Sequence, residues 1–162
     1  MLRIAAVGLI LFLLAAAKLA AQRSSPPVPA VQWVPAPALF PRGAQVAVLS
    51  GDPFKPVVLK VLISMPDGYR MPPHFHATDE HVEVRQGTFL VGMGDKLDVK
   101  KTIPLAVGDT ATAPAGMHHY FVTKGATIVS VTIMGPYVLT YVHPKDEPGR
   151  LPLRILMVSF TA

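Results

Sequence analysis

The stretch "YRMPPHFHATDEHVEVRQG", from Tyr69 to Gly87, differs from the apolar sequence around it. It contains three of the six histidines and three of the ten acidic residues of this 162-residue chain. Imidazoles and carboxylates gathered in one short segment can hold a metal, carry out acid–base chemistry or form a polar strand face. The order of the residues narrows this choice.

Strand alternation divides the segment into two faces. Residues two apart in a strand point to the same side of a sheet, so His74 and His76 share a face. Glu80 shares a face with Val82 and Val84, which mark the interior. An unpaired buried carboxylate is costly, so Glu80 needs a cation, a hydrogen-bond network or a raised pKa. The two histidines of the same segment are the nearest groups that could share a cation with it.

The opposite face carries His81, Glu83 and Arg85, a combination typical of a solvated surface. A second segment, "GDTATAPAGMHHYFVTKG" from Gly108 to Gly125, contains a Pro-Ala-Gly turn followed by a strand pattern. In that strand His119 and Phe121 share one face, and His118 and Tyr120 share the other. Alternation alone leaves open which of these two faces is buried.

The rest of the chain predicts an all-β domain. Short segments rich in β-branched and aromatic residues recur about every 8–12 residues and end at Gly, Pro or Asp, which is typical of a sandwich or barrel. We expect separate strands in "AQVAVLSGDP", "KPVVLKVLISMPDGY", "EHVEVRQG", "TFLVGMGD", "IPLAVGDTATAPAG", "HHYFVTKG", "ATIVSVTIMG" and "YVLTYVHP". No amphipathic helix longer than one or two turns is expected after the N-terminal leader.

The two histidine segments resemble the two motifs of the cupin superfamily. The first motif, G-x5-H-x-H-x3,4-E-x6-G, is matched from Gly68 to Gly87. The second, G-x5-P-x-G-x2-H-x3-N, is matched from Gly108 to Thr123, with Thr123 in place of the usual Asn. An H-x-H pair alone is a weak signal, but both motifs in order are specific. The chain is most similar to small, exported, single-domain cupins.

This resemblance implies a double-stranded β-helix, or jelly roll. It also implies that His74, His76, Glu80 and His119 converge on one divalent metal. Neutral imidazoles with one carboxylate suit Fe, Mn, Ni, Zn or Cu and do not suit Ca. Asp79 and Glu83 are rivals to Glu80, and cupins with three histidine ligands exist, so Glu80 is either a ligand or a candidate base.

Other candidates have weaker support. Phe89, Met93, Met117 and Phe121 are candidates to line a ligand pocket, although such residues also form ordinary cores. His81 and His118 are expected at the surface because they face away from the predicted ligands, and His143 is expected at a strand end in solvent.

Four regions are predicted along the chain. Residues 1–21 combine a basic start, an apolar run and small residues, which is typical of a cleaved signal peptide; an uncleaved anchor is the alternative. Residues 22–42 are rich in proline and are expected to be extended, with Trp33, Leu39 and Phe40 against the domain. Residues 43–148 form the predicted cupin β-barrel domain. Residues 149–162 are an apolar tail with no assigned role.

The predicted leader places the protein in the periplasm or outside the cell. Loss of Arg3 and Lys18 with the leader lowers the formal net charge from +5 to +3. The basic residues are scattered, so we expect no nucleic-acid partner, and we expect no membrane contact after cleavage. The chain has no cysteine, which excludes thiolate ligands, a cysteine nucleophile and disulfides. A homodimer through edge strands is an expectation from the resemblance.

These features leave several functions open. The first is a metal-dependent dioxygenase that acts on a small chelating compound, such as a diketone or a phenol. The second is an isomerase or decarboxylase that uses the same ligands without oxygen. The third is an exported, non-catalytic module that binds or senses a metal or small ligand.

Overall fold

The computed structural model describes residues 30–149. The predicted signal peptide and residues 150–162 of the predicted tail lie outside this range. The described part is all-β apart from two short 3-10 helices, which confirms the predicted fold class. Within residues 30–149, no helix is long and apolar enough to cross a membrane.

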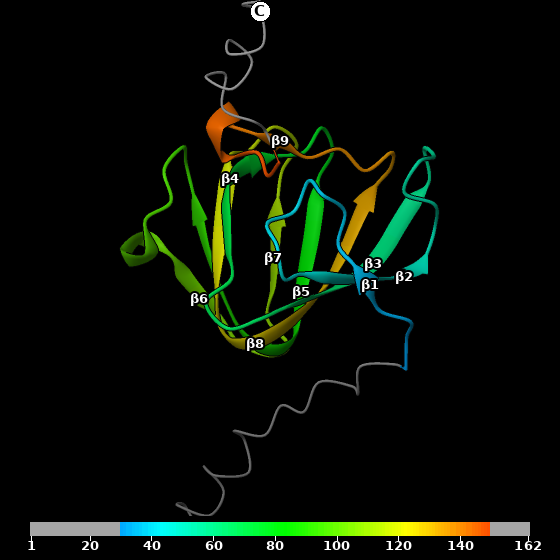
Figure 1. Ribbon diagram of the computed structural model, residues 1–162, viewed down its shortest axis with the longest axis horizontal. Helices are drawn as coiled ribbons and strands as arrows, with labels where there is room; N and C mark the ends of the chain where they lie inside the picture. Colours follow the sequence, from blue (N-terminus) through cyan, green and yellow to red (C-terminus); the bar gives the residue numbers. More distant parts are fainter. Residues whose placement is uncertain (1–29, 150–162) are drawn as a thin grey trace, which may run out of the picture.

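Nine strands form one sheet that curls back on itself as a jelly roll (Figure 1). The strands are β1 (Val34–Pro35), β2 (Gln45–Ser50), β3 (Val58–Met65), β4 (Arg70–Phe75), β5 (Glu80–Met93), β6 (Ile103–Leu105), β7 (Thr110–Ala113), β8 (His119–Met134) and β9 (Thr140–Tyr141). The helices are η1 (Val99–Lys101) and η2 (Pro144–Asp146).

Strand β8 is the centre of this arrangement. It pairs in antiparallel register with β3, β4 and β5, so that His74 of β4 lies opposite His119 of β8. The edge strands extend the sheet beyond this centre, with β1 paired to β2, β2 to β3, and β9 to β4. Glu80, at the start of β5, is opposite Ile133 near the other end of β8, and its side chain reaches His119 because the sheet curls back on itself (Figure 1).

Strands β5 and β8 are longer than expected. The segments "EHVEVRQG" and "TFLVGMGD" were expected as two strands but form the single strand β5. The segments "HHYFVTKG" and "ATIVSVTIMG" likewise form the single strand β8. The glycines taken as strand ends lie within the strands, where Gly87 and Gly125 both have φ +76°. A Cβ on Gly87 would lie 2.5 Å from the carbonyl oxygen of Ala126, so glycine lets the pair bend without ending. The segment "YVLTYVHP" contributes only the two residues of β9.

The core lies between the two curled halves of the sheet. Alternate residues of β3 and β5 point inward, including Leu59, Val61, Val82 and Val84, as the alternation of the sequence indicated. The outward side chain of His81 is exposed. Burial of this apolar face is the main source of stability for such a sheet.

The second half of the proline-rich segment packs on the domain. Phe40 is buried in the core, and Leu39 packs against it. The carbonyl oxygens of Leu39 and Pro41 accept hydrogen bonds from the hydroxyls of Tyr141 and Tyr69, at 2.7 and 2.9 Å. The apolar residues of this segment therefore anchor it, as expected, and it forms one wall of the interior.

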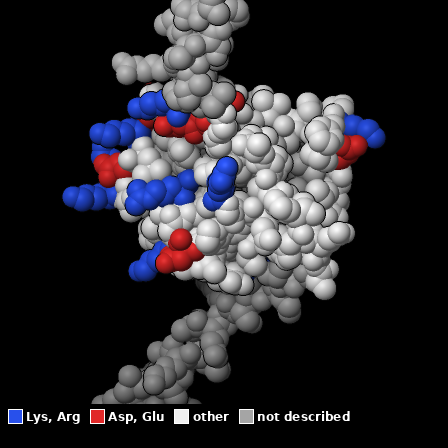
Figure 2. Space-filling view, viewed as in Figure 1, with Lys and Arg blue, Asp and Glu red and all other residues white. Residues whose placement is uncertain are grey.

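Charged side chains are unevenly distributed over the surface. In the view of Figure 2, Lys, Arg, Asp and Glu intermingle mainly at the side that carries β6 and η1. Most of the face over the N-terminal segment and β2 is free of charge. Several exposed apolar side chains belong to β2, β3 and the loop between them, namely Val48, Phe54, Val57 and Val58.

Candidate metal centre

The candidate site lies where β4, β5 and β8 meet. His74 is the second-last residue of β4, and His76 follows that strand. Glu80 begins β5, and His119 begins β8. All four side chains are buried. The structure thus brings together the four residues predicted as ligands, and it places His119 and Phe121 on the inward face that the sequence left undecided.

Three imidazoles converge closely. His74, His76 and His119 each offer a ring nitrogen, and these three atoms lie within 4.8 Å of one another. The ring centroids of His74 and His119 are 4.2 Å apart, and those of His76 and His119 are 5.6 Å apart. This grouping has the size of a site that holds one metal ion.

Each imidazole is oriented by a hydrogen bond from its other nitrogen. The Nδ1 atoms of His74, His76 and His119 lie 2.8, 2.8 and 3.0 Å from the carbonyl oxygens of Pro72, Val138 and Met117. A carbonyl oxygen only accepts, so each Nδ1 carries a proton and donates it. The neutral ring then keeps a lone pair on Nε2, which is the tautomer that binds a metal.

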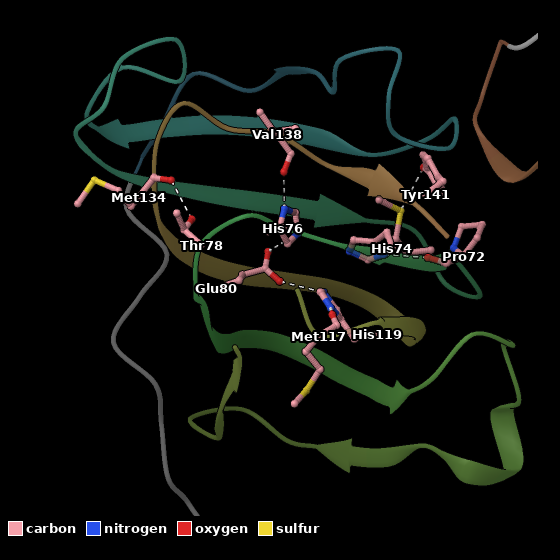
Figure 3. A network of polar contacts seen from close by, with 11 residues as sticks. Pro72, His74, His76, Thr78, Glu80, Met117, His119, Met134, Val138 and Tyr141 are labelled. Atoms are coloured by element: carbon pink, nitrogen blue, oxygen red, sulfur yellow. Dashed lines mark hydrogen bonds and ion pairs between the residues drawn. The ribbon is translucent and has the colours of Figure 1, made fainter. Parts of the chain in front are cut away.

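Glu80 lies against two of these nitrogens. Its carboxylate oxygens are 3.6 Å from Nε2 of His76 and 3.2 Å from Nε2 of His119. Figure 3 shows Glu80 between these two rings, with His76 in turn between Glu80 and Val138. Glu80 is therefore placed beside the three-histidine group, on the side of His76 and His119.

The electrostatics of the group favour a charged Glu80 carboxylate and a neutral His74 ring, and they favour the protonated form of His119. Burial, followed by the charge of His119, lowers the pKa of His74 to about 3, so this ring is neutral near neutral pH. Burial alone acts to raise the pKa of Glu80, but contact with His119 and the charges of His76 and His119 outweigh it and lower that pKa. Burial acts to lower the pKa of His119, and Glu80 outweighs it and raises the pKa.

The residues present fit a divalent transition metal. Within residues 30–149, Nε2 of His76 and Nε2 of His119 are fully buried and have no hydrogen-bond partner of good geometry. A buried polar atom without a partner is costly. A cation bound between the lone pairs and the Glu80 carboxylate satisfies them all, and imidazole nitrogen is a preferred ligand of Fe, Mn, Ni, Zn and Cu.

The predicted pocket residues divide into two groups. Phe89 and Phe121 are buried and pack on each other, with ring centroids 4.6 Å apart, and Phe121 lies edge-on to His74. Met93 and Met117 are 50% and 38% exposed. These two methionine side chains are therefore poorly placed to line a buried pocket, since they point outward from the strand ends. Met117 contributes through its backbone carbonyl instead.

The remaining histidines lie away from the site. His81 bonds Thr112 on the outer face, and Nδ1 of His118 lies 2.6 Å from Oδ1 of Asp95. Nε2 of His143 is 2.7 Å from the carbonyl oxygen of Asp95. The expected surface positions of His81 and His118 are confirmed, and His143 ties the chain after β9 to the loop before η1.

Two contributors escaped the sequence analysis. Val138 supplies the carbonyl that orients His76, and the Tyr137 ring lies 5.4 Å from the His76 ring. Burial, followed by the charge of Glu80, raises the pKa of Tyr137 well above its ordinary value, so this phenol stays protonated. These residues lie outside both motifs, and a backbone carbonyl leaves no signature in residue type.

Comparison with known proteins agrees with this geometry. Residues 61–135 match the family model described as "Cupin domain", a range that contains both histidine motifs. Residues 61–135 therefore form a cupin domain. None of the curated proteins compared with the sequence matches it.

Several solved cupin structures share the fold. An acetylacetone dioxygenase from Acinetobacter johnsonii has a TM-score of 0.58 and 14% identity, over 80% of this chain and 86% of its own. A protein from Methylibium petroleiphilum PM1, described as a putative acetylacetone dioxygenase, has a TM-score of 0.56 and 18% identity, over 76% of this chain and 85% of its own. An RmlC-like cupin from Shewanella frigidimarina NCIMB 400 has a TM-score of 0.52 and 20% identity, over 65% and 84%. At these identities the similarity concerns the fold.

Proposed function

We propose that this cupin binds one divalent transition metal through His74, His76 and His119, and that Glu80 is held as an anion beside it. The observation that carries the proposal is the common orientation of the three rings. Each donates Nδ1–H to a backbone carbonyl, and each therefore presents an Nε2 lone pair to the same buried space. Such oriented imidazoles are the usual support of a metal site.

We further propose that the protein is a dioxygenase-type enzyme that acts on a small chelating organic compound. A bound divalent metal supplies Lewis acidity, which polarises the oxygens of a chelating ligand. The chain supplies a buried, aromatic setting, in which the rings of Phe121 and Tyr141 lie 6.2 and 6.4 Å from the His74 ring. The name of the Acinetobacter protein denotes oxygenation of a small diketone, and this reaction suits such a setting.

The role of Glu80 follows from its surroundings. A general base works best when its pKa lies near the working pH, whereas the pKa of Glu80 is lowered. A divalent cation in the same place acts in the same direction. We therefore infer that Glu80 balances charge, as a ligand or as a partner of the ligands, rather than removing a proton from substrate.

The metal site is tested by metal analysis of protein purified without a histidine tag. Wild-type protein should carry close to one metal per chain, and His74→Ala with His119→Ala should carry almost none. A matched double variant, His81→Ala with His143→Ala, removes two histidines outside the site and should keep the metal. Retention of stoichiometric metal by the first double variant would overturn the proposal.

The reaction is tested by oxygen uptake of the Fe(II)-loaded protein against a panel of diketones and catechols. Uptake that depends on His74 and His119 supports the enzyme. Tight, reversible binding of the same compounds without uptake instead supports the non-catalytic binding module. Conversion of a compound without oxygen use favours the isomerase or decarboxylase.

A further inference from the structure

An apolar cavity of about 90 Å³ lies beside the candidate metal centre. Its walls include side chains of β2 and β3, namely Val46, Val48, Leu59 and Val61, together with Phe40 of the N-terminal segment and Tyr137. The wall is entirely apolar, and Val48 at its rim is half exposed. An apolar space offers water no partners and therefore favours an apolar occupant.

Tyr137 connects this cavity to the metal centre. One neighbour of its ring is His76, at a centroid distance of 5.4 Å. Another is Phe40, stacked at 6.2 Å and also in the cavity wall. Tyr137 is held in place by a hydrogen bond of 2.8 Å from its backbone N–H to the carbonyl oxygen of Pro53. The ring thus borders both the apolar space and the His76 imidazole.

The Tyr137 hydroxyl is available to a ligand. Within residues 30–149 it forms no hydrogen bond, whereas the hydroxyls of Tyr69 and Tyr141 both donate to carbonyl oxygens of the N-terminal segment. A phenol hydroxyl carries one hydrogen that it can donate. Polar groups that lack a protein partner inside a binding site commonly find one in the ligand.

We propose that this cavity is a subsite for an apolar substituent of the metal-chelating ligand, and that Tyr137, at the border between the cavity and the imidazoles, donates a hydrogen bond to the chelating oxygens. The inference rests on the proposed metal site and narrows its ligand. At about 30 Å³ per water-sized group, the cavity holds roughly three non-hydrogen atoms. The preferred ligand is therefore a neutral or anionic oxygen chelator that carries a short alkyl group.

The test uses alkyl hydroxamic acids as probes, because they chelate many divalent metals through two oxygens. The full-length protein is loaded with Co(II), and binding of acetohydroxamic, butanohydroxamic and hexanohydroxamic acid is followed by the visible spectrum of the metal. Each methylene buried in the cavity should tighten binding about fourfold. The gain should level off once the cavity is full.

Two matched variants separate the subsite from general hydrophobicity. Val48→Phe places a larger group at the cavity rim, and Val58→Phe places the same group on the outer face of the neighbouring strand, where the valine is about equally exposed. Val48→Phe should abolish the chain-length gain without changing acetohydroxamic acid binding. Val58→Phe should keep the gain. Tyr137→Phe should weaken all three probes by a similar factor and keep the gain.

The outcomes distinguish the two proposals. A protein that does not bind Co(II) at His74, His76 and His119 overturns the proposed metal site and the subsite with it. Binding of acetohydroxamic acid with no gain from longer chains, or with the same gain in Val48→Phe, overturns the subsite and leaves the metal site standing.

Discussion

Thr123 shows how one residue adapts the second motif of the family. Where the motif usually has Asn, the Thr123 hydroxyl donates to the carbonyl oxygen of Pro66 at 2.6 Å and accepts from the backbone N–H of Tyr69 at 2.9 Å. It is buried, and it fastens the turn that leads into β4. The departure from the motif therefore serves the strand that carries His74, and it does not touch the histidine group.

Thr123→Val should destabilise the protein by about 1–3 kcal/mol, because it keeps the shape but leaves buried partners without their hydrogen bonds. The free energy of unfolding in urea measures this. Thr110→Val, on the exposed side of edge strand β7, is the matched control and should change stability by less than about 0.5 kcal/mol. Equal effects of the two substitutions would contradict the assigned role.

Tyr141 should control part of the alkaline stability. Burial, followed by the charges of Glu147 and Asp146, raises the pKa of Tyr141 to about 12 from its ordinary value of 10.0. Between these values the folded state holds a proton that the unfolded state has lost. The stabilisation is thus complete below pH 10 and is lost as the pH rises through 12.

Tyr141→Phe lacks this proton and should show a shallower fall in stability over that pH range. At pH 7 the variant should lose about 0.5–1.5 kcal/mol, for the hydrogen bond to Leu39. Denaturation curves at a series of pH values check both effects. An unchanged alkaline slope would show that Tyr141 titrates normally in the folded state.

At the residue scale, the sequence predicted the histidines better than their supports. Strand alternation put His74 and His76 on one face, and the resemblance to the cupin motifs implied that His119 joins them. The structure brings the three together. The backbone carbonyls that orient these rings could not be predicted, because every residue has a carbonyl oxygen. Tyr137 was expected to be an ordinary aromatic residue of a strand. Its contact with His76 could not be predicted, because the two residues are far apart in the sequence.

At the scale of elements, composition predicted strands but not their continuity. A glycine between two apolar runs was taken as the end of a strand at Gly87 and Gly125. Both glycines instead bend long strands, a difference that depends on the partner strand and therefore on the folded structure. Tyr137 and Val138 were expected to begin a strand, but they lie outside the strands, and the carbonyl of Val138 supports His76.

Gly135→Ala should disturb the segment from Gly135 to Val138. A Cβ at position 135 would lie 2.3 Å from the carbonyl oxygen of Lys55, so the backbone must move, together with Tyr137 and Val138. We expect a loss of about 1–3 kcal/mol from overpacking and a loss of metal affinity of about tenfold from the weakened support of His76. Met134→Ala, at a neighbouring exposed position, should leave metal affinity unchanged in the same titration. Normal metal affinity in Gly135→Ala would show that this segment does not support the metal site.

At the scale of the whole molecule, metal should stabilise the fold. A ligand that binds only the folded state at 100 times its Kd adds about 2.7 kcal/mol to the free energy of unfolding. Removal of metal with a chelator should therefore lower the urea midpoint, and its return should restore it. The double variant His74→Ala with His119→Ala should not respond. A response of that variant equal to that of wild-type protein would place the stabilising metal elsewhere.

Three expectations about the whole molecule stay predictions. Cleavage of residues 1–21 is checked by the mass and N-terminal sequence of the exported protein. The expected homodimer is checked by sedimentation. Partition between periplasm and medium decides the compartment.

The three supporting carbonyls differ in how far along the chain they lie. His74 and His119 each use the residue two positions before them, so their orientation is local. His76 uses Val138, which is 62 residues away, and the contact forms only when the chain has closed on itself. A metal ion that needs all three rings thus checks that folding is complete. A misfolded or truncated chain would lack the Val138 carbonyl at His76, so this one ring would not be oriented. Such a chain should bind the metal more weakly than the folded protein.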